Sequence, residues 1–146
     1  MIQADILVVG AGPAGATAAL NLAPVRRVVM VERRAEDQPR IGESLPPAAR
    51  RLLADMGLLG AFEREGHAPY YGNRSVWGAP ELDETDFLRD PDGHGWHLDR
   101  VQFDAWLRRV AVGRGARMLC PARIESIEQD GTACRSPSRL IRSASS

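Results

Sequence analysis

Hydrophobic residues near the start of the chain form two short continuous runs, separated by a segment of small residues. Residues 5–9 (DILVV) and 28–31 (VVMV) are almost entirely aliphatic and rich in β-branched side chains. Continuous runs of this kind predict strands that are buried on both faces of a parallel sheet. Between them, alanines and Leu22 predict a helix of small residues, so residues 4–32 are expected to form a β–α–β unit.

The turn after the first run has the spacing G-x-G-x-x-G, with Gly10, Gly12 and Gly15 at its three positions. The first glycine permits a tight turn, the second lets backbone approach a pyrophosphate, and the third lets helix and strand pack closely. The start of the helix, with Pro13 and Ala14, presents free N–H groups to an anion. We therefore predict that these five residues bind a dinucleotide.

Glu32 ends the second run, 22 residues after Gly10. Its carboxylate can accept hydrogen bonds from the hydroxyls of an adenosine ribose, and it would repel a ribose 2′-phosphate. Strand, turn, helix, second strand and acid occur in order, which favours an ADP-containing dinucleotide over a merely structural turn. Arg33 is a further candidate for cofactor contact, whereas Arg34 is better explained as surface charge.

The segment after Glu32 is a polar loop, RRAEDQPRIGESLPP, where an NAD-binding domain usually continues with a helix and a third strand. The loop therefore favours FAD over NAD. We expect Ser44 to cap a helix from Leu45 to Met56 that Gly57 closes. Residues 61–97 show no helical period and are rich in glycine, proline and aromatic residues. Residues 73–77, 85–88 and 95–98 are expected to be short strands.

A second helix is predicted to start after Asp99, the N-cap residue, with Gln102 completing a capping box. Its apolar positions recur at helical spacing and are interpreted as core, and Gly113 is expected to close it. These core positions are Phe103, Trp106, Leu107 and Val110. A strand near 117–119 and another ending at the turn signal Asp130-Gly131 follow. The tail, 131–146, is rich in Ser and Arg and is expected to be irregular or disordered.

Composition narrows the class of protein. The 146 residues suffice for one domain, and 19 acidic residues balance 19 basic ones, all of them arginine. No basic stripe indicates a nucleic-acid partner, and no apolar run approaches the roughly 20 residues of a membrane span. The first strand begins almost at Met1, which leaves no room for a signal peptide, so a cytoplasmic protein is expected. Neither the histidines nor the two cysteines have metal-ligand spacing.

Four segments together resemble one family. These are DILVVGAGPAGATAAL, VVMVERR, PRIGESLPPAARRLLADMGLL and GWHLDRVQFDAWLRRVA. They are similar to the N-terminal part of flavin-dependent monooxygenases and tryptophan-halogenase-like flavoproteins, over about residues 4 to 130. The resemblance implies an α/β fold of glutathione-reductase type: a Rossmann-like FAD/NAD(P)-binding domain with a parallel sheet, plus part of an antiparallel substrate-side sheet. Residues 1–130 would form the FAD-binding domain, with a substrate-side insertion at about 61–98.

The resemblance implies FAD as the cofactor and adds site residues in the second half of the chain. In that family the Gly42-Glu43-Ser44 segment runs beside the flavin, and the glycine lets backbone approach a flat ring. Two roles remain for Glu43: a general acid or base, or a solvated loop carboxylate without a catalytic role. Arg40 is a candidate for the pyrophosphate. Arg100 lies in a first helical turn, where a cation opposes the helix dipole, so a nearby phosphate or carboxylate is expected; the family pattern favours FAD.

These expectations converge on an FAD-dependent oxidoreductase of monooxygenase type. The resemblance covers only the first part of the family's fold, so a truncated member is expected, and the chain alone is not expected to turn over. A non-catalytic dinucleotide-binding fragment or pseudo-enzyme is the alternative. Halogenation is disfavoured, because halogenases of that group use an active-site lysine in this half of the chain, and no lysine is present here. A flavin reductase or NAD(P)H would supply electrons to an unidentified small-molecule or carrier-bound substrate, and no catalytic residue is assigned.

Overall fold

A computed structural model describes residues 2–35, 43–75, 83–87, 89–130 and 133–135. The chain divides into two compact units. The first contains residues 1–38 and 104–146, and the second contains residues 39–103. Each unit is described by itself.

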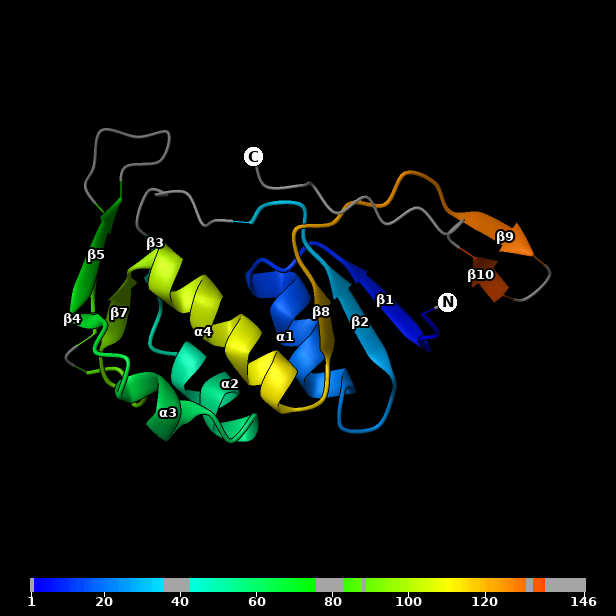
Figure 1. Ribbon diagram of the computed structural model, residues 1–146. Coiled ribbons are helices and arrows are strands. Elements are labelled where there is room, and N and C mark those ends of the chain that lie inside the picture. The colour runs from blue at the N-terminus through cyan, green and yellow to red at the C-terminus, as the bar shows by residue number, and fades with distance from the viewer. Residues whose placement is uncertain (1, 36–42, 76–82, 88, 131–132, 136–146) are drawn as a thin grey trace. The chain divides into compact units, whose positions relative to one another are not determined.

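The first unit is built on a three-stranded parallel sheet (Figure 1). Its strands are β1 (Ile6–Val9), β2 (Val28–Val31) and β8 (Arg117–Leu119), in the order β1-β2-β8. The helix α1 (Pro13–Leu22) connects β1 to β2 and packs against both. Ile6 is in register with Val28 across the first pair. The predicted β–α–β unit is thus confirmed.

Burial differs between the two strands of this unit. All four residues of β2 are buried, as predicted, but the exposed fractions of Leu7 and Val9 in β1 are 41% and 64%. These two side chains share one face because side chains alternate along a strand, whereas Val8 faces α1 at Gly15. The prediction that β1 is buried on both faces was therefore wrong. The helix α1 covers one face of β1, and on the other face the side chains of Leu7 and Val9 are exposed. In the described sheet β1 is also an edge strand.

The other face of β2 belongs to a small core cluster of Val29, Val31 and Ala122, against which Leu119 and Ile124 pack. Later in the chain, β9 (Glu128–Asp130) pairs antiparallel with β10 (Ala133–Arg135). The strand β10 falls in the segment expected to be irregular, so that expectation was wrong for residues 133–135. Backbone pairing with β9 supplies the order that local sequence does not indicate.

The second unit contains two antiparallel sheets. The first has the order β3-β7-β4, formed by Glu43–Leu45, Gly95–Leu98 and Ala68–Tyr70, and the second pairs β5 (Gly72–Ser75) with β6 (Asp83–Asp86). Antiparallel strands were predicted in this region, and the prediction for 95–98 agrees at both ends. The strand β4 was missed.

Two short helices, α2 (Ala49–Asp55) and α3 (Leu59–Glu63), complete the second unit. The fully buried Phe62 of α3 meets the ring of Trp96 edge to face, with centroids 5.2 Å apart. It meets Phe103 in the same way at 5.9 Å. The helix α3 was not predicted, because five residues are too few to show a helical period.

Ser44 does not cap a helix, contrary to prediction. It lies in β3, opposite His97 of β7, and α2 begins only at Ala49. The N–H of Ala49 donates to the carbonyl of Pro46 at 3.0 Å, so a turn through the two prolines precedes the helix. Gly57 closes α2 as predicted, with a φ of +68° and its N–H donating to the carbonyl of Ala54 at 2.8 Å.

The longest helix, α4 (Arg100–Gly113), begins as predicted: Asp99 Oδ1 accepts the N–H of Gln102 at 3.1 Å. Within the described residues no hydrogen bond joins Gln102 Oε1 to the N–H of Asp99, so the capping box is not closed; Gln102 Nε2 donates to the carbonyl of Glu65 at 2.6 Å. Gly115, with a φ of +106°, closes the helix in place of the predicted Gly113. Within the described residues, no helix is long and apolar enough to cross a membrane.

Candidate dinucleotide-binding site

The glycine-rich turn between β1 and α1 has the backbone that its spacing predicts. Gly10 adopts a φ of +94°, which disfavours residues with a side chain, and its N–H donates to the carbonyl of Val31 at 2.8 Å. This bond fixes the start of the turn against the end of β2.

Gly15 and Gly12 have different environments. A Cβ on Gly15 would lie 2.1 Å from the carbonyl oxygen of Gly10 and 3.1 Å from a methyl carbon of Val8, so no side chain fits between helix and strand. A Cβ on Gly12 would meet nothing within 4 Å. Packing therefore requires a glycine at position 15. Gly12 faces open space, as expected of a position where backbone approaches a ligand.

The first turn of α1 is suited to an anion. Gly12 is the N-cap and provides no side-chain acceptor, Pro13 stands at the first helical position, and the turn contains no acidic residue. N–H groups at a helix start carry partial positive charge and favour a phosphate. The structure thus places Gly10, Gly12, Pro13, Ala14 and Gly15 together, as the sequence predicts.

Glu32 lies at the end of β2 and connects that end to the glycine-rich turn. Its Oε2 accepts the N–H of Ala11 at 2.9 Å, and its Oε1 accepts the N–H of Arg34 at 3.1 Å. Burial by itself raises the pKa of Glu32, but backbone hydrogen bonds from Ala11, Arg34 and Arg33, with the charge of Arg108, outweigh burial and lower the pKa. The carboxylate is therefore kept ionised, which suits an acceptor for ribose hydroxyls.

Two features of this site were not predicted from the sequence. Ala11, which is almost fully buried, supplies the amide that holds Glu32. Arg108 of α4 acts on the same carboxylate through its charge. The side chain of Arg33 is exposed, and its backbone N–H donates a hydrogen bond to the Glu32 carboxylate. The predicted residues Arg40 and Gly42 lie outside the described residues.

The second unit brings together two other predicted residues. The guanidinium of Arg100 forms an ion pair with Oε1 of Glu43. The side chain of Arg100 is 7% exposed and that of Glu43 is 65% exposed. The expected anion in the first turn of α4 therefore includes a carboxylate of the chain itself. The neighbouring Ser44 is hydrogen-bonded through Oγ to Nδ1 of His97 at 3.0 Å, a contact that the sequence did not predict.

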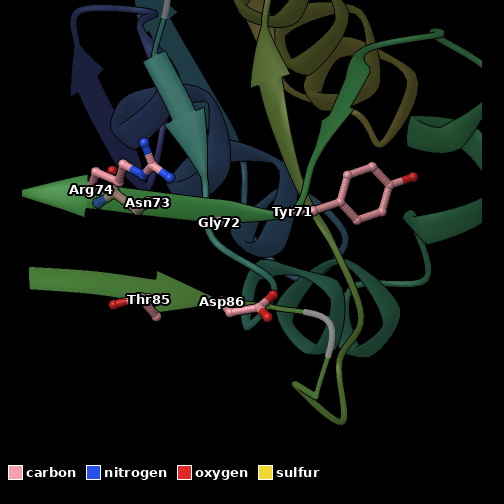
Figure 2. A pocket seen from close by; sticks show the side chains of 6 residues that line it. All are labelled: Tyr71, Gly72, Asn73, Arg74, Thr85 and Asp86. Carbon is pink, nitrogen blue, oxygen red and sulfur yellow. The ribbon is translucent and has the colours of Figure 1, made fainter.

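The second unit also contains a hollow. It is lined by Tyr71, by Gly72, Asn73 and Arg74 of β5, and by Thr85 and Asp86 of β6 (Figure 2). None of the predicted cofactor-binding residues lines it. The candidate cofactor site is therefore the glycine-rich turn with Glu32, and not this hollow.

A parallel β–α–β unit with this turn, an open helix start and an ionised acid after the second strand defines a dinucleotide-binding domain. The chain belongs to the FAD binding domain family, which matches residues 3–143. FAD is thus its cofactor, and the α/β fold inferred from the resemblance is confirmed. The glycine-rich turn and Glu32 fit the ADP half of FAD: Gly12 leaves room for the pyrophosphate, and the lowered pKa of Glu32 keeps its carboxylate available as an acceptor for ribose hydroxyls.

Individual relatives agree with this family. LodB of Marinomonas mediterranea, described as an FAD-dependent oxidoreductase, is 34% identical over 128 residues, which cover 86% of this chain and 35% of LodB. The flavin-dependent halogenase gsfI of Penicillium aethiopicum is 34% identical over 125 residues, 84% of this chain and 24% of gsfI. The structure of the myxobacterial chondrochloren halogenase CndH matches with a TM-score of 0.76 and 32% identity, over 88% of this chain and 31% of CndH.

The chain therefore spans about a quarter to a third of the length of these relatives. Their names place the family among FAD-dependent oxidoreductases and halogenases.

Proposed function

We propose that the chain provides the ADP-binding part of an FAD-dependent oxidoreductase of monooxygenase type. The observation that carries the proposal is the bond between the Glu32 carboxylate and the amide of Ala11, which joins the acid of the second strand to the glycine-rich turn. Gly10, Gly12, Pro13, Ala14 and Gly15 would hold the pyrophosphate, and Glu32 would accept the ribose hydroxyls. Bound FAD supplies the redox chemistry, and the protein contributes binding and orientation.

The remaining predicted residues keep their roles as part of this proposal. The cofactor would also be contacted by Glu43, Ser44 and Arg100. Further cofactor contacts would come from Arg33 and Gly42, and Arg40 would contact the pyrophosphate. The ion pair with Arg100 supports a positioning role for Glu43, since one carboxylate oxygen is already held by a guanidinium. Electrons would come from NAD(P)H, directly or through a flavin reductase.

The first experiment identifies the nucleotide. The purified chain is denatured, and the released nucleotide is analysed by chromatography; separately, the apoprotein is titrated with FAD, FMN, NAD and NADP. We expect FAD to be released and to bind most tightly, because both the anion site and the ribose acceptor are used. Release of NAD alone, or equal affinity for FMN, which lacks the adenosine half, would contradict the proposal.

Halogenation is the second candidate, and the names of gsfI and CndH favour it. The absence of lysine from all 146 residues weighs against it, because the resembling halogenases use an active-site lysine in the half of their chain to which this sequence is similar. The two candidates differ in product. Incubation of a longer protein that contains this chain with FAD, NADH, a flavin reductase, oxygen, bromide and a phenol as test substrate would give a brominated phenol in one case and a hydroxylated phenol in the other. A brominated product would refute the monooxygenase proposal and support halogenation.

A further inference from the structure

The backbone of Glu32 is held by the segment that follows β8. Val31 and Leu119, the last residues of β2 and β8, are in register. The N–H of Glu32 donates to the carbonyl of Leu119 at 2.9 Å, and the N–H of Ala122 donates to the carbonyl of Glu32 at 2.8 Å. Both backbone groups of Glu32 are therefore fixed by residues 119–122. All of these residues belong to the first unit.

Cys120 lies between these two backbone contacts in the chain and makes a third contact to the same turn. Its Sγ donates to the carbonyl of Arg34 at 2.9 Å. The N–H of Arg34 donates in turn to Oε1 of Glu32 at 3.1 Å. Arg34 thus has its N–H on the carboxylate and its carbonyl on the thiol.

The two contacts of Arg34 together fix the conformation of the turn. Because peptide bonds are planar, the peptide planes before and after Arg34 are related only by its φ and ψ. The carboxylate of Glu32 orients the plane before Arg34, and the thiol of Cys120 orients the plane after it. Loss of the thiol bond would release the second plane and loosen the turn that holds the carboxylate.

A firmly held carboxylate is a better acceptor for a ligand. A carboxylate has about four lone-pair sites. The backbone N–H groups of Ala11, Arg33 and Arg34 bind the carboxylate of Glu32, which leaves room for a ligand hydroxyl. Because these amides already fix the side chain, less conformational freedom is lost when a ligand binds.

We propose that Cys120 is a positioning residue for the ribose end of the cofactor site. The inference rests on the proposed function, in which Glu32 accepts the ribose hydroxyls. The thiol acts through Arg34: it holds the carbonyl of this residue, and the N–H of the same residue orients the carboxylate.

The experiment titrates the full chain with FAD and with an FAD analogue in which 2′-deoxyadenosine replaces adenosine. The ratio of the two dissociation constants measures the contact to the ribose 2′-hydroxyl, and a general loss of stability does not change this ratio. We expect the wild type to prefer FAD and Glu32→Ala to show a ratio near one. Cys120→Ala should shift the ratio towards that of Glu32→Ala. It should also weaken FAD binding by about 2- to 10-fold, the range of one net hydrogen bond.

Two further substitutions of Cys120 separate the hydrogen bond from packing. Cys120→Ser keeps a donor and should restore the wild-type ratio. Cys120→Val removes the donor without shortening the side chain and should match Cys120→Ala, so it also provides the comparison if the alanine variant does not fold.

Asp5→Ala is the matched control from the same unit. Oδ2 of Asp5 accepts the backbone N–H of Arg27 at 2.9 Å, at the opposite end of β2 from Glu32. The substitution therefore removes an exposed bond between a side chain and the backbone, and the ratio should remain that of the wild type.

The outcomes distinguish the inference from the proposed function. A wild-type ratio in folded Cys120→Ala or Cys120→Val overturns the inference alone, and so does a Cys120→Ser variant that behaves like Cys120→Ala. If the wild type binds no FAD, or does not prefer FAD over the analogue, the proposed role of Glu32 fails and the inference fails with it.

Discussion

The carboxylate of Glu32 accepts a hydrogen bond at 2.9 Å from the backbone N–H of Ala11, 21 residues earlier in the chain. The bond joins the carboxyl end of β2 to the middle of the glycine-rich turn. A residue that sequence patterns assign to the ribose thus also holds the loop that we propose as the pyrophosphate site. Loss of this side chain is expected to affect both contacts.

Substitution of Glu32 tests this double role. Glu32→Ala should weaken FAD binding by about 1–3 kcal/mol, because ribose hydroxyls lose a charged acceptor and the turn loses its support. Glu32→Gln keeps an acceptor oxygen without the charge and should show a smaller loss. Titration followed by quenching of flavin fluorescence measures both. An unchanged dissociation constant in a folded Glu32→Ala variant would refute the assignment.

Two glycines of the same turn should separate packing from binding. Gly15→Ala places a methyl group against the backbone of Gly10 and should lower the free energy of unfolding by about 1–3 kcal/mol. Gly12→Ala meets open space and should leave thermal stability nearly unchanged, yet weaken FAD binding because its methyl group occupies the side on which the pyrophosphate approaches. Thermal unfolding with and without FAD distinguishes the two. Equal losses of stability would contradict the distinction.

The end of α4 offers a second glycine pair. Gly115, at a φ of +106°, donates its N–H to the carbonyl of Val112 at 3.0 Å, and Gly115→Ala should destabilise the protein by about 1 kcal/mol. Gly113 is helical and a Cβ there would meet nothing within 4 Å, so Gly113→Ala should stabilise by about 0.5–1 kcal/mol. Chemical denaturation measures the two opposite signs. Destabilisation by Gly113→Ala would show that Gly113 has a role the backbone does not reveal.

His67 should make the second unit sensitive to acid. Its ring packs between Phe62 and Phe103, with centroids 5.2 Å and 6.0 Å away, and its buried Nε2 has no hydrogen-bond partner in the described chain. Burial lowers the pKa of His67 from the ordinary 6.5, against the opposing charges of Glu65 and Asp99. Because the folded state disfavours the protonated ring, His67 contributes stability above the ordinary pKa and loses it as pH falls through the lowered value.

We therefore expect the melting temperature to fall as the pH decreases below about 6.5, and His67→Phe to reduce that fall because its ring does not titrate. Leu53→Ala is the packing control, since Leu53 is buried and its side chain does not titrate, so stability should fall by a similar amount at both pH values. Differential scanning calorimetry at pH 7.5 and 5.5 provides the comparison. An equal pH dependence in wild type and His67→Phe would exclude His67 as the cause.

Local sequence determined the first unit's essential architecture. The two apolar runs, the glycines between them and Glu32 lie within 28 residues, and each property that they predict depends on neighbours in the chain. Short loops make such β–α–β units largely self-specifying. The start of α4 at Asp99 and the end of α2 at Gly57 could also be predicted, because each capping group lies only a few residues from the atom that it binds.

Tertiary structure alone decided the partners of the Gly-Glu-Ser segment. Ser44 is a good N-cap residue by itself, but pairing with His97, 53 residues away, places it in a strand. Arg100 likewise finds Glu43 across 57 residues, where the sequence indicated only that some anion was needed. Cross-strand pairs and ion pairs of this kind depend on register and on the return of the chain, and no local pattern encodes either.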